Sequence, residues 1–171
     1  SSAASDVYKR QVLYFEHKKA YRFLKEEVPE TYYTVPLGKA DVKRSGEDIT
    51  VFCYGLMVNY CLQAADILAN DGIDVEVVDL RTVYPLDKTT IIERSQRTGK
   101  VLLVTEDNLE GSIMSEVSAI IAENCLFDLD APIMRLAAPD VPSMPFSPTL
   151  ENEIMMNPEK IQDKMRELAQ F

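Results

Sequence analysis

The stretch that decides the fold runs from Ile49 to Leu80 and reads I-T-V-F-C-Y-G-L-M-V-N-Y-C-L-Q-A-A-D-I-L-A-N-D-G-I-D-V-E-V-V-D-L. Its two ends, Ile49–Tyr54 and Val75–Leu80, are short apolar runs rich in β-branched residues, which is typical of strands buried on both faces. Between them, apolar residues recur at helical spacing over Leu56–Asn70, and Gly72 marks the helix end. This order predicts a βαβ unit with parallel strands.

The same alternation continues beyond this unit. Further strands are predicted over Val101–Thr105 and Pro132–Ala137, and further helices over Asp87–Thr98 and Ser112–Glu123, with Asp87 and Ser112 as candidate helix caps. Before the unit, Lys39–Arg44 and the polar turn Ser45–Asp48 predict an antiparallel strand at the sheet edge. The predicted fold class is therefore α/β: a doubly wound, mainly parallel sheet with one antiparallel edge strand and helices on both faces.

The chain is predicted to have three parts. Residues 1–11 show neither helical nor strand periodicity, so we expect a loose or foreign leader. Residues 12–38 are expected to form a linker or arm, because an apolar run there gives way to basic residues and then to acidic ones. The domain proper covers 39–171. It contains a proline-rich segment, 138–148, expected to be an extended loop, and a final helix opened by Asn157-Pro158-Glu159.

Composition restricts the classes of function. The chain has 171 residues and a formal net charge of −10, which repels phosphate backbones and favours a basic protein partner, so nucleic-acid binding is not expected. No apolar stretch approaches the roughly 20 residues that span a bilayer, and no signal peptide is visible. We therefore expect a cytoplasmic protein that does not bind membranes.

The cysteines and the histidine of the chain form no catalytic or metal-binding pattern in the sequence. Cys53, Cys61 and Cys125 lack C-x-x-C spacing and lie in apolar runs, so reduced core thiols are favoured over a redox role. The single histidine, His17, leaves no zinc-binding cluster. Beside two lysines it is expected to be solvated or in an interface rather than catalytic.

In an open parallel sheet, ligands bind beyond the carboxyl ends of the strands. There, Gly55 lacks the further glycines of a phosphate-binding loop, so a plain tight turn is favoured. Glu106 and Asp107 follow a strand and suit either an acid–base pair or, as the favoured interpretation, solvated or capping carboxylates. The residues alone thus show no catalytic machinery.

Arg81, which follows another strand, has two interpretations. A guanidinium binds a carboxylate ligand through two parallel hydrogen bonds, which would suit a free-standing module for small anions. The favoured interpretation is a local salt bridge with Asp79 or Asp87.

Several motifs in register resemble one known family. They are F-E-H-K-K-A-Y-R (15–22), Y-T-V-P-L-G-K-A-D-V (33–42), G-E-D-I-T-V-F-C-Y-G (46–55), V-E-V-V-D-L-R-T-V-Y-P-L-D (75–87), T-G-K-V-L-L-V-T-E-D (98–107), L-F-D-L-D-A-P-I-M-R (126–135) and A-A-P-D-V-P (137–142). Together they resemble the β-subunit of thiamine-diphosphate-dependent 2-oxo acid dehydrogenases, from about Val12 to Phe171. The segment 110–132 is most similar to bacterial branched-chain enzymes. Pyruvate and acetoin relatives more often carry G-G-F where this chain has Gly111-Ser112-Ile113.

The resemblance covers only the C-terminal half of such a subunit, the transketolase C-terminal domain. It implies a parent enzyme that decarboxylates a 2-oxo acid on thiamine diphosphate, with magnesium, and transfers the acyl group to a lipoyl acyltransferase. In the family, other domains hold the cofactor and the catalytic histidine. We therefore expect no catalytic, cofactor-binding or metal-binding residue in this chain, and no activity of the chain alone.

The resemblance also implies partners. These are the α-subunit, a second β-subunit and the small, basic peripheral subunit-binding domain of the acyltransferase. In related β-subunits this last module faces the acid of L-D-A-P, here Asp130, and the chain-terminal carboxylate, here at Phe171, with Asp128 as a nearby supporting candidate. The alternative is that Asp130 is a turn residue and Phe171 a frayed end.

Overall fold

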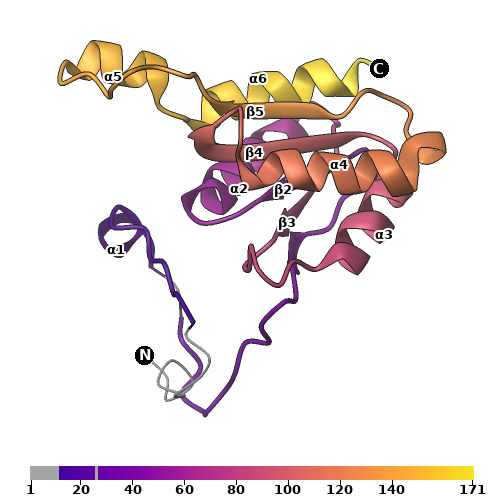
Figure 1. Ribbon diagram of the computed structural model, residues 1–171, viewed down its shortest axis with the longest axis horizontal. Helices are drawn as coiled ribbons and strands as arrows, with labels where there is room; N and C mark the ends of the chain where they lie inside the picture. Colours follow the sequence, from indigo (N-terminus) through magenta and orange to yellow (C-terminus); the bar gives the residue numbers. More distant parts are fainter. Residues whose placement is uncertain (1–11, 26) are drawn as a thin grey trace. The chain divides into compact units, whose positions relative to one another are not determined.

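The computed structural model describes residues 12–25 and 27–171, which form two compact units with a boundary between Tyr32 and Tyr33. The first contains one short helix, α1 (Ala20–Phe23). The second contains the sheet and its helices (Figure 1). The leader predicted over 1–11 lies outside the described residues, and the boundaries predicted for the arm and the domain stay predictions.

The second unit is built on a five-stranded sheet. Its strands are β1 (Asp41–Arg44), β2 (Ile49–Cys53), β3 (Val75–Asp79), β4 (Val101–Asn108) and β5 (Met134–Ala138), in the spatial order β1-β3-β2-β4-β5. The last four are mutually parallel, and β1 pairs antiparallel with β3 at one edge. The predicted fold class, with its single antiparallel edge strand, is confirmed.

Helices cover both faces of the sheet. They are α2 (Leu56–Ala69), α3 (Lys88–Thr98), α4 (Ile113–Cys125), the 3-10 turn η2 (Leu126–Asp128), α5 (Pro148–Ile154) and α6 (Pro158–Ala169). Helices α2 and α6 share one apolar core, and α3 and α4 share the other. Along β4, Leu102 faces the first core and Leu103 the second, as the two-residue strand period requires.

The helix ends show which capping predictions hold. Asp87 caps α3 by accepting a hydrogen bond from the Thr90 amide, and Asn157 caps α6 by accepting one from Lys160, so both predicted starts are confirmed. Ser112 precedes α4, but its hydroxyl makes no capping hydrogen bond, so that prediction is wrong. Its extended backbone places it at the cap position without bringing the oxygen to a free amide.

The proline-rich segment is a loop as predicted except at its two ends, the first of which, Ala138, is the last residue of β5. Residues 139–147 form neither helix nor strand, but Pro148 is the first residue of α5. Proline is tolerated there because the first turn of a helix needs no backbone N–H bond. Within 12–25 and 27–171, no helix has both the length and the apolar character needed to cross a bilayer.

Candidate docking site

The topology gathers three chain segments at one edge of the sheet. Helices α3, α4 and α6 run back against the parallel strands, so their carboxyl ends meet at the strands' amino ends. Gly99 ends α3, η2 follows α4, and Phe171 follows α6. Figure 1 shows the turn after α4 and the chain end toward the same end of the strands, at the right of the view. The predicted site residues Asp128, Asp130 and Phe171 therefore belong to one end of the fold.

Asp130 is fixed by the end of α3. Its amide donates a 2.8 Å hydrogen bond to the Gly99 carbonyl oxygen. Gly99 has a left-handed φ of 66°, and a Cβ atom there would lie 2.6 Å from Oδ2 of Asp130 and 3.0 Å from the Asp128 carbonyl oxygen. The turn can approach α3 this closely only because residue 99 has no side chain.

Asp128 is held by a side chain of the same helix. Its Oδ2 accepts a 3.0 Å hydrogen bond from Nε2 of Gln96. Asp128 also affects the buried thiol of Cys125. Burial of that thiol raises its pKa most, and the negative charge of Asp128 raises it further. Asp128 and Asp130 are both exposed, so two carboxylates stand at this edge in contact with solvent.

The end of α6 supplies the third part of the site. The Phe171 amide donates to the Leu168 carbonyl at 3.3 Å, which continues the helical turn to the last residue. Phe171 as a whole residue is 61% exposed. Nζ of Lys100 lies 3.5 Å from the Ala169 carbonyl oxygen, so the residue after Gly99 contacts the end of α6. The last residue is thus hydrogen-bonded to the end of α6, and its role in docking stays a prediction.

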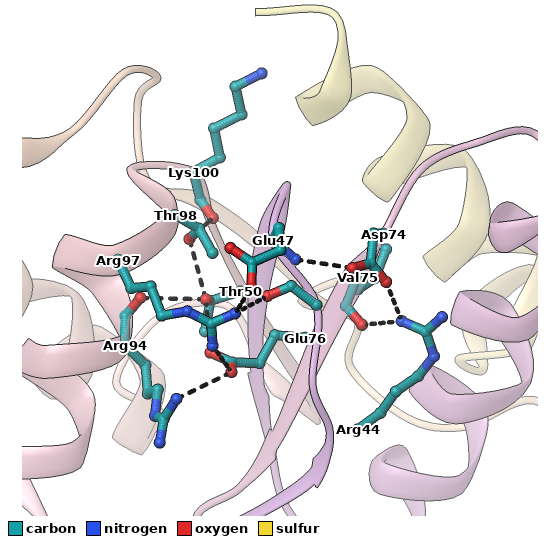
Figure 2. A network of polar contacts seen from close by, with 11 residues as sticks. Arg44, Glu47, Thr50, Asp74, Val75, Glu76, Arg94, Arg97, Thr98 and Lys100 are labelled. Carbon is teal, nitrogen blue, oxygen red and sulfur yellow. Dashed lines mark hydrogen bonds and ion pairs between the residues drawn. The ribbon is translucent and has the colours of Figure 1, made fainter.

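A buried polar network lies behind this edge (Figure 2). The side chain of Glu76, on β3, has no exposed surface; its carboxylate lies 2.9 Å from Nη1 of Arg97, 3.3 Å from Nη1 of Arg94 and 3.1 Å from the Thr50 hydroxyl. The Thr98 hydroxyl lies 3.0 Å from that of Thr50 and 3.2 Å from the Lys100 carbonyl oxygen. The network thus reaches the segment that carries Gly99.

Arg97 also joins this network to the turn before β2. Its Nη2 donates to the Gly46 carbonyl oxygen at 2.6 Å and to Oε1 of Glu47 at 2.7 Å. A Cβ atom on Gly46 would lie 2.3 Å from the Val75 carbonyl carbon, so only glycine fits at this crossing. Arg97 therefore connects α3, β3 and the β1–β2 turn in one set of contacts.

The opposite, carboxyl edge of the sheet does not bring its predicted residues into a reactive group. Gly55 is the turn residue expected there, with a positive φ of 61°. Glu106 and Asp107 are exposed, and Oδ1 of Asp107 accepts a hydrogen bond from the Asn108 amide, as a local cap would. A mostly apolar cavity of about 70 Å³ adjoins Glu106 and is lined by Leu56, Met57, Tyr60, Ala138, Met144, Met155 and Met156.

Arg81 does form a salt bridge, but with a different partner from those predicted. Its Nη2 lies 2.6 Å from Oδ2 of Asp41 on β1, whereas Asp79 accepts only the Arg81 backbone amide and Asp87 receives Lys39. Arg81 has a positive φ of 55°, and its side chain reaches Asp41 on the antiparallel edge strand. The guanidinium is thus engaged within the fold rather than free for a small anion.

The remaining candidate site residues, the cysteines and the histidine, have structural rather than catalytic surroundings. Cys53, Cys61 and Cys125 are free, buried thiols, as predicted. Burial, and then the adjacent Cys61 thiol, hold the pKa of Cys53 well above its usual range. Nδ1 of His17 accepts a hydrogen bond from the Lys19 amide in the first unit. Among the residues that the structure describes, no three His, Cys, Asp or Glu side chains gather as metal ligands would.

Sequence reasoning missed the residues that position the docking edge. Gln96 and Lys100 resemble ordinary surface residues in the sequence. Gln96 contacts Asp128, which lies 32 positions away, and Lys100 contacts the end of α6, which lies 69 positions away. Gly99 did carry a signal, because glycine directly after a helical stretch is typical of a left-handed helix end. That signal predicts the turn, but not the carboxylate packed against it.

Comparison with known proteins agrees with the fold described above. The family profile described as "Transketolase, C-terminal domain" matches residues 38–161, so the chain belongs to the transketolase C-terminal domain family. A solved structure of a split-gene transketolase, titled an inactive beta4 tetramer, superposes with a TM-score of 0.71 at 23% identity, covering 84% of this chain and 47% of that one. It shows the same fold.

Curated relatives are more specific. The chain is 66% identical over 160 residues to the 2-oxoisovalerate dehydrogenase subunit beta of Bacillus subtilis, covering 94% of this chain and 49% of the relative. It is 45% identical to the acetoin:2,6-dichlorophenolindophenol oxidoreductase subunit beta of that organism, over 88% of this chain and 43% of the relative. The chain thus spans about half the length of these relatives, and its predicted resemblance to 2-oxo acid dehydrogenase β-subunits is confirmed.

Proposed function

We propose that this chain is the C-terminal assembly domain of the β-subunit of a branched-chain 2-oxo acid dehydrogenase in the cytoplasm. The observation that carries this proposal is the identity of 66% to a 2-oxoisovalerate dehydrogenase subunit beta, against 45% and 44% to the acetoin and pyruvate counterparts of the same organism. The parent enzyme would oxidatively decarboxylate 2-oxo acids and transfer the acyl group to the lipoyl group of an acyltransferase. This domain would pack against the α-subunit and a second β-subunit.

Thiamine diphosphate and magnesium would serve the parent reaction. The residues of this chain do not fit either group: over 12–25 and 27–171 no metal-ligating cluster forms, and Gly55 is the lone glycine where a phosphate loop would need several. We therefore assign no cofactor contact and no reaction step to this chain.

The second part of the proposal concerns docking. Asp128, Asp130 and Phe171 would bind the peripheral subunit-binding domain of the acyltransferase, which is basic in this family. Two exposed carboxylates stand at this edge, and the carboxyl ends of α3, α4 and α6 add the negative ends of their helix dipoles. The net charge of −10 further favours encounter with a cationic partner.

Calorimetric titration of the chain with that acyltransferase domain, at low and at physiological salt, tests the docking role. We expect a one-to-one complex that weakens as salt rises, because the charges at the interface are screened. Asp130→Lys should abolish binding, since it places a like charge against the partner. The matched control is Asp140→Lys, which changes the net charge equally at an exposed position after β5, at the opposite edge of the sheet.

The two variants separate the site from bulk charge. Equal weakening by both would mean that overall charge, rather than this edge, attracts the partner. Full binding by Asp130→Lys would show that the site lies elsewhere on the chain.

A further inference from the structure

We propose that the docking edge has an apolar half, formed by Leu126 and Phe127 of η2, which binds an apolar side chain that flanks the cationic residue of the partner. This inference rests on the docking role proposed above and deepens it, because it specifies the chemistry of the partner surface. The recognised surface would be a basic patch beside an exposed aliphatic or aromatic group. We call Leu126 and Phe127 the η2 apolar pair.

The exposure of this pair is the first observation. As residues, Phe127 is 99% exposed and Leu126 is 61% exposed, and η2 has no buried residue. Folding of the chain therefore gains almost nothing from the Phe127 ring, whose apolar surface would be removed from water only on binding a partner. An exposed aromatic beside charged groups is typical of the centre of a protein interface.

The position of the pair is the second observation. Phe127 directly precedes Asp128 and lies three residues before Asp130, so apolar and acidic side chains share one short turn. A partner that binds this turn thus meets apolar and acidic residues within five consecutive positions, 126–130. Phe171, 61% exposed, adds a second aromatic group at the same edge of the sheet.

The rigidity of the turn is the third observation. Gln96 holds the Asp128 carboxylate, and the Asp130 amide is bonded to the Gly99 carbonyl, so the backbone on the carboxyl side of Phe127 is anchored to α3. On the other side, Cys125 is fully buried at the end of α4. Binding therefore orders few additional degrees of freedom, which favours Phe127 as an affinity-determining contact.

Charge complementarity identifies the occupant. The edge carries exposed carboxylates and negative helix ends in a chain with a net charge of −10, so a second copy of this chain would bring like charges together. A cationic partner is attracted by these groups, with Lys100, half-buried against the end of α6, as an opposing charge. The partner we infer is therefore a basic protein surface with an apolar neighbour, rather than another copy.

A salt series distinguishes the apolar from the acidic half. The probe is the peripheral subunit-binding domain of a branched-chain acyltransferase, titrated into the full chain and its variants between low and physiological salt. Phe127→Ala should weaken binding roughly tenfold or more at every salt concentration, with the salt dependence of log Kd unchanged, because no charge is removed. Asp130→Asn should reduce that salt dependence.

Two further variants serve as controls. Phe146→Ala removes an equally exposed ring, 103% accessible, from the proline-rich loop after β5, and should bind as the original chain does. Phe127→Leu keeps an apolar group and should restore much of the affinity. Unchanged thermal unfolding of Phe127→Ala would show that the fold is intact, as expected for a side chain that contacts little of the chain.

Each outcome decides between the proposals. Full affinity of Phe127→Ala, with binding lost in Asp130→Lys, would overturn the apolar half and leave the docking role standing. Absence of binding by the original chain at either salt would overturn the docking role and this inference together. A Phe127→Ala variant that binds normally but sediments as a smaller species than the original chain would assign the pair to self-association and overturn the inference.

Discussion

Nη1 of Arg97 lies 2.9 Å from Oε2 of Glu76, and this ion pair joins helix α3 to an interior strand of the sheet. The Glu76 side chain is fully buried, whereas that of Arg97 is 30% exposed. Burial of a carboxylate is costly unless charged or polar partners surround it. Here Arg94 and Thr50 complete the surroundings. The ion pair therefore fixes α3, the helix that supports the docking edge.

Replacing Glu76 should destabilise the fold. We expect Glu76→Ala to lower the free energy of unfolding by about 3 kcal/mol, at the lower end of the range for broken buried ion pairs because both arginines keep partial access to water. Urea unfolding measures the loss. Glu123→Ala, at an exposed position on α4, is the control and should change stability by less than about 0.5 kcal/mol. Comparable losses in the two variants would contradict a structural role for the pair.

Gly99 should separate stability from docking. Gly99→Ala places a left-handed φ on alanine, which costs about 1 kcal/mol, and also pushes a Cβ atom against Asp130 and the Asp128 carbonyl. Gly72→Ala is a matched control, because Gly72 has a φ of +80° but open space around its Cβ position. Both variants should lose stability, Gly99→Ala the more because its Cβ atom must also displace the turn, and Gly99→Ala alone should weaken docking in the calorimetric titration. Equal docking by the two would show that the Asp128–Asp130 turn need not be held against α3.

Asp87 should make stability depend on acidity. Burial disfavours its charge, but hydrogen bonds from the amides of Ala40 and Thr90 and from the Thr90 hydroxyl outweigh burial and lower its pKa. A lowered pKa stabilises the fold at pH values above the unfolded pKa of about 3.9, and this stabilisation disappears as pH falls through the folded value. Asp87→Asn should therefore cost on the order of 1 kcal/mol at pH 7 and progressively less toward pH 3.

Asp79 is the opposite case, because its pKa is raised in the fold whereas that of Asp87 is lowered. Burial raises its pKa despite the hydrogen bond from the Arg81 amide, so its ionised form opposes folding at neutral pH. Asp79→Asn should thus preserve or increase stability at pH 7, while Asp87→Asn decreases it. Urea unfolding of both variants from pH 7 to pH 3 makes the comparison, and the same sign of effect in both would contradict this assignment of charges.

The sheet could be predicted from local pattern because its strands are continuous apolar runs separated by helical spacing. Asp87 and Asn157 were predictable caps for the same reason, since capping depends on residues three positions apart. Arg81 was assigned to a neighbouring acid in the sequence, whereas its partner, Asp41, lies 40 positions away on the edge strand. Pattern alone does not supply such pairs.

Glu76 shows the same limit within the core. In V-E-V-V-D a glutamate resembles a solvent-facing strand residue, and only the packing of Arg94 and Arg97 over β3 makes its burial favourable. The docking residues were predicted through family resemblance, but their support by Gln96, Gly99 and Lys100 depends on how α3, η2 and α6 meet. These contacts between helices depend on tertiary structure, so no single sequence motif predicts them.

The docking edge draws on residues near positions 96–100, 126–130 and 168–171, segments brought together only when helices α3, α4 and α6, from both faces of the sheet, all end at the amino ends of the strands. A chain still being synthesised, or one with α6 undocked, would lack part of the surface. Recruitment through this edge would therefore select finished subunits. The order of events would be set by geometry: folding first, incorporation into the larger assembly afterwards.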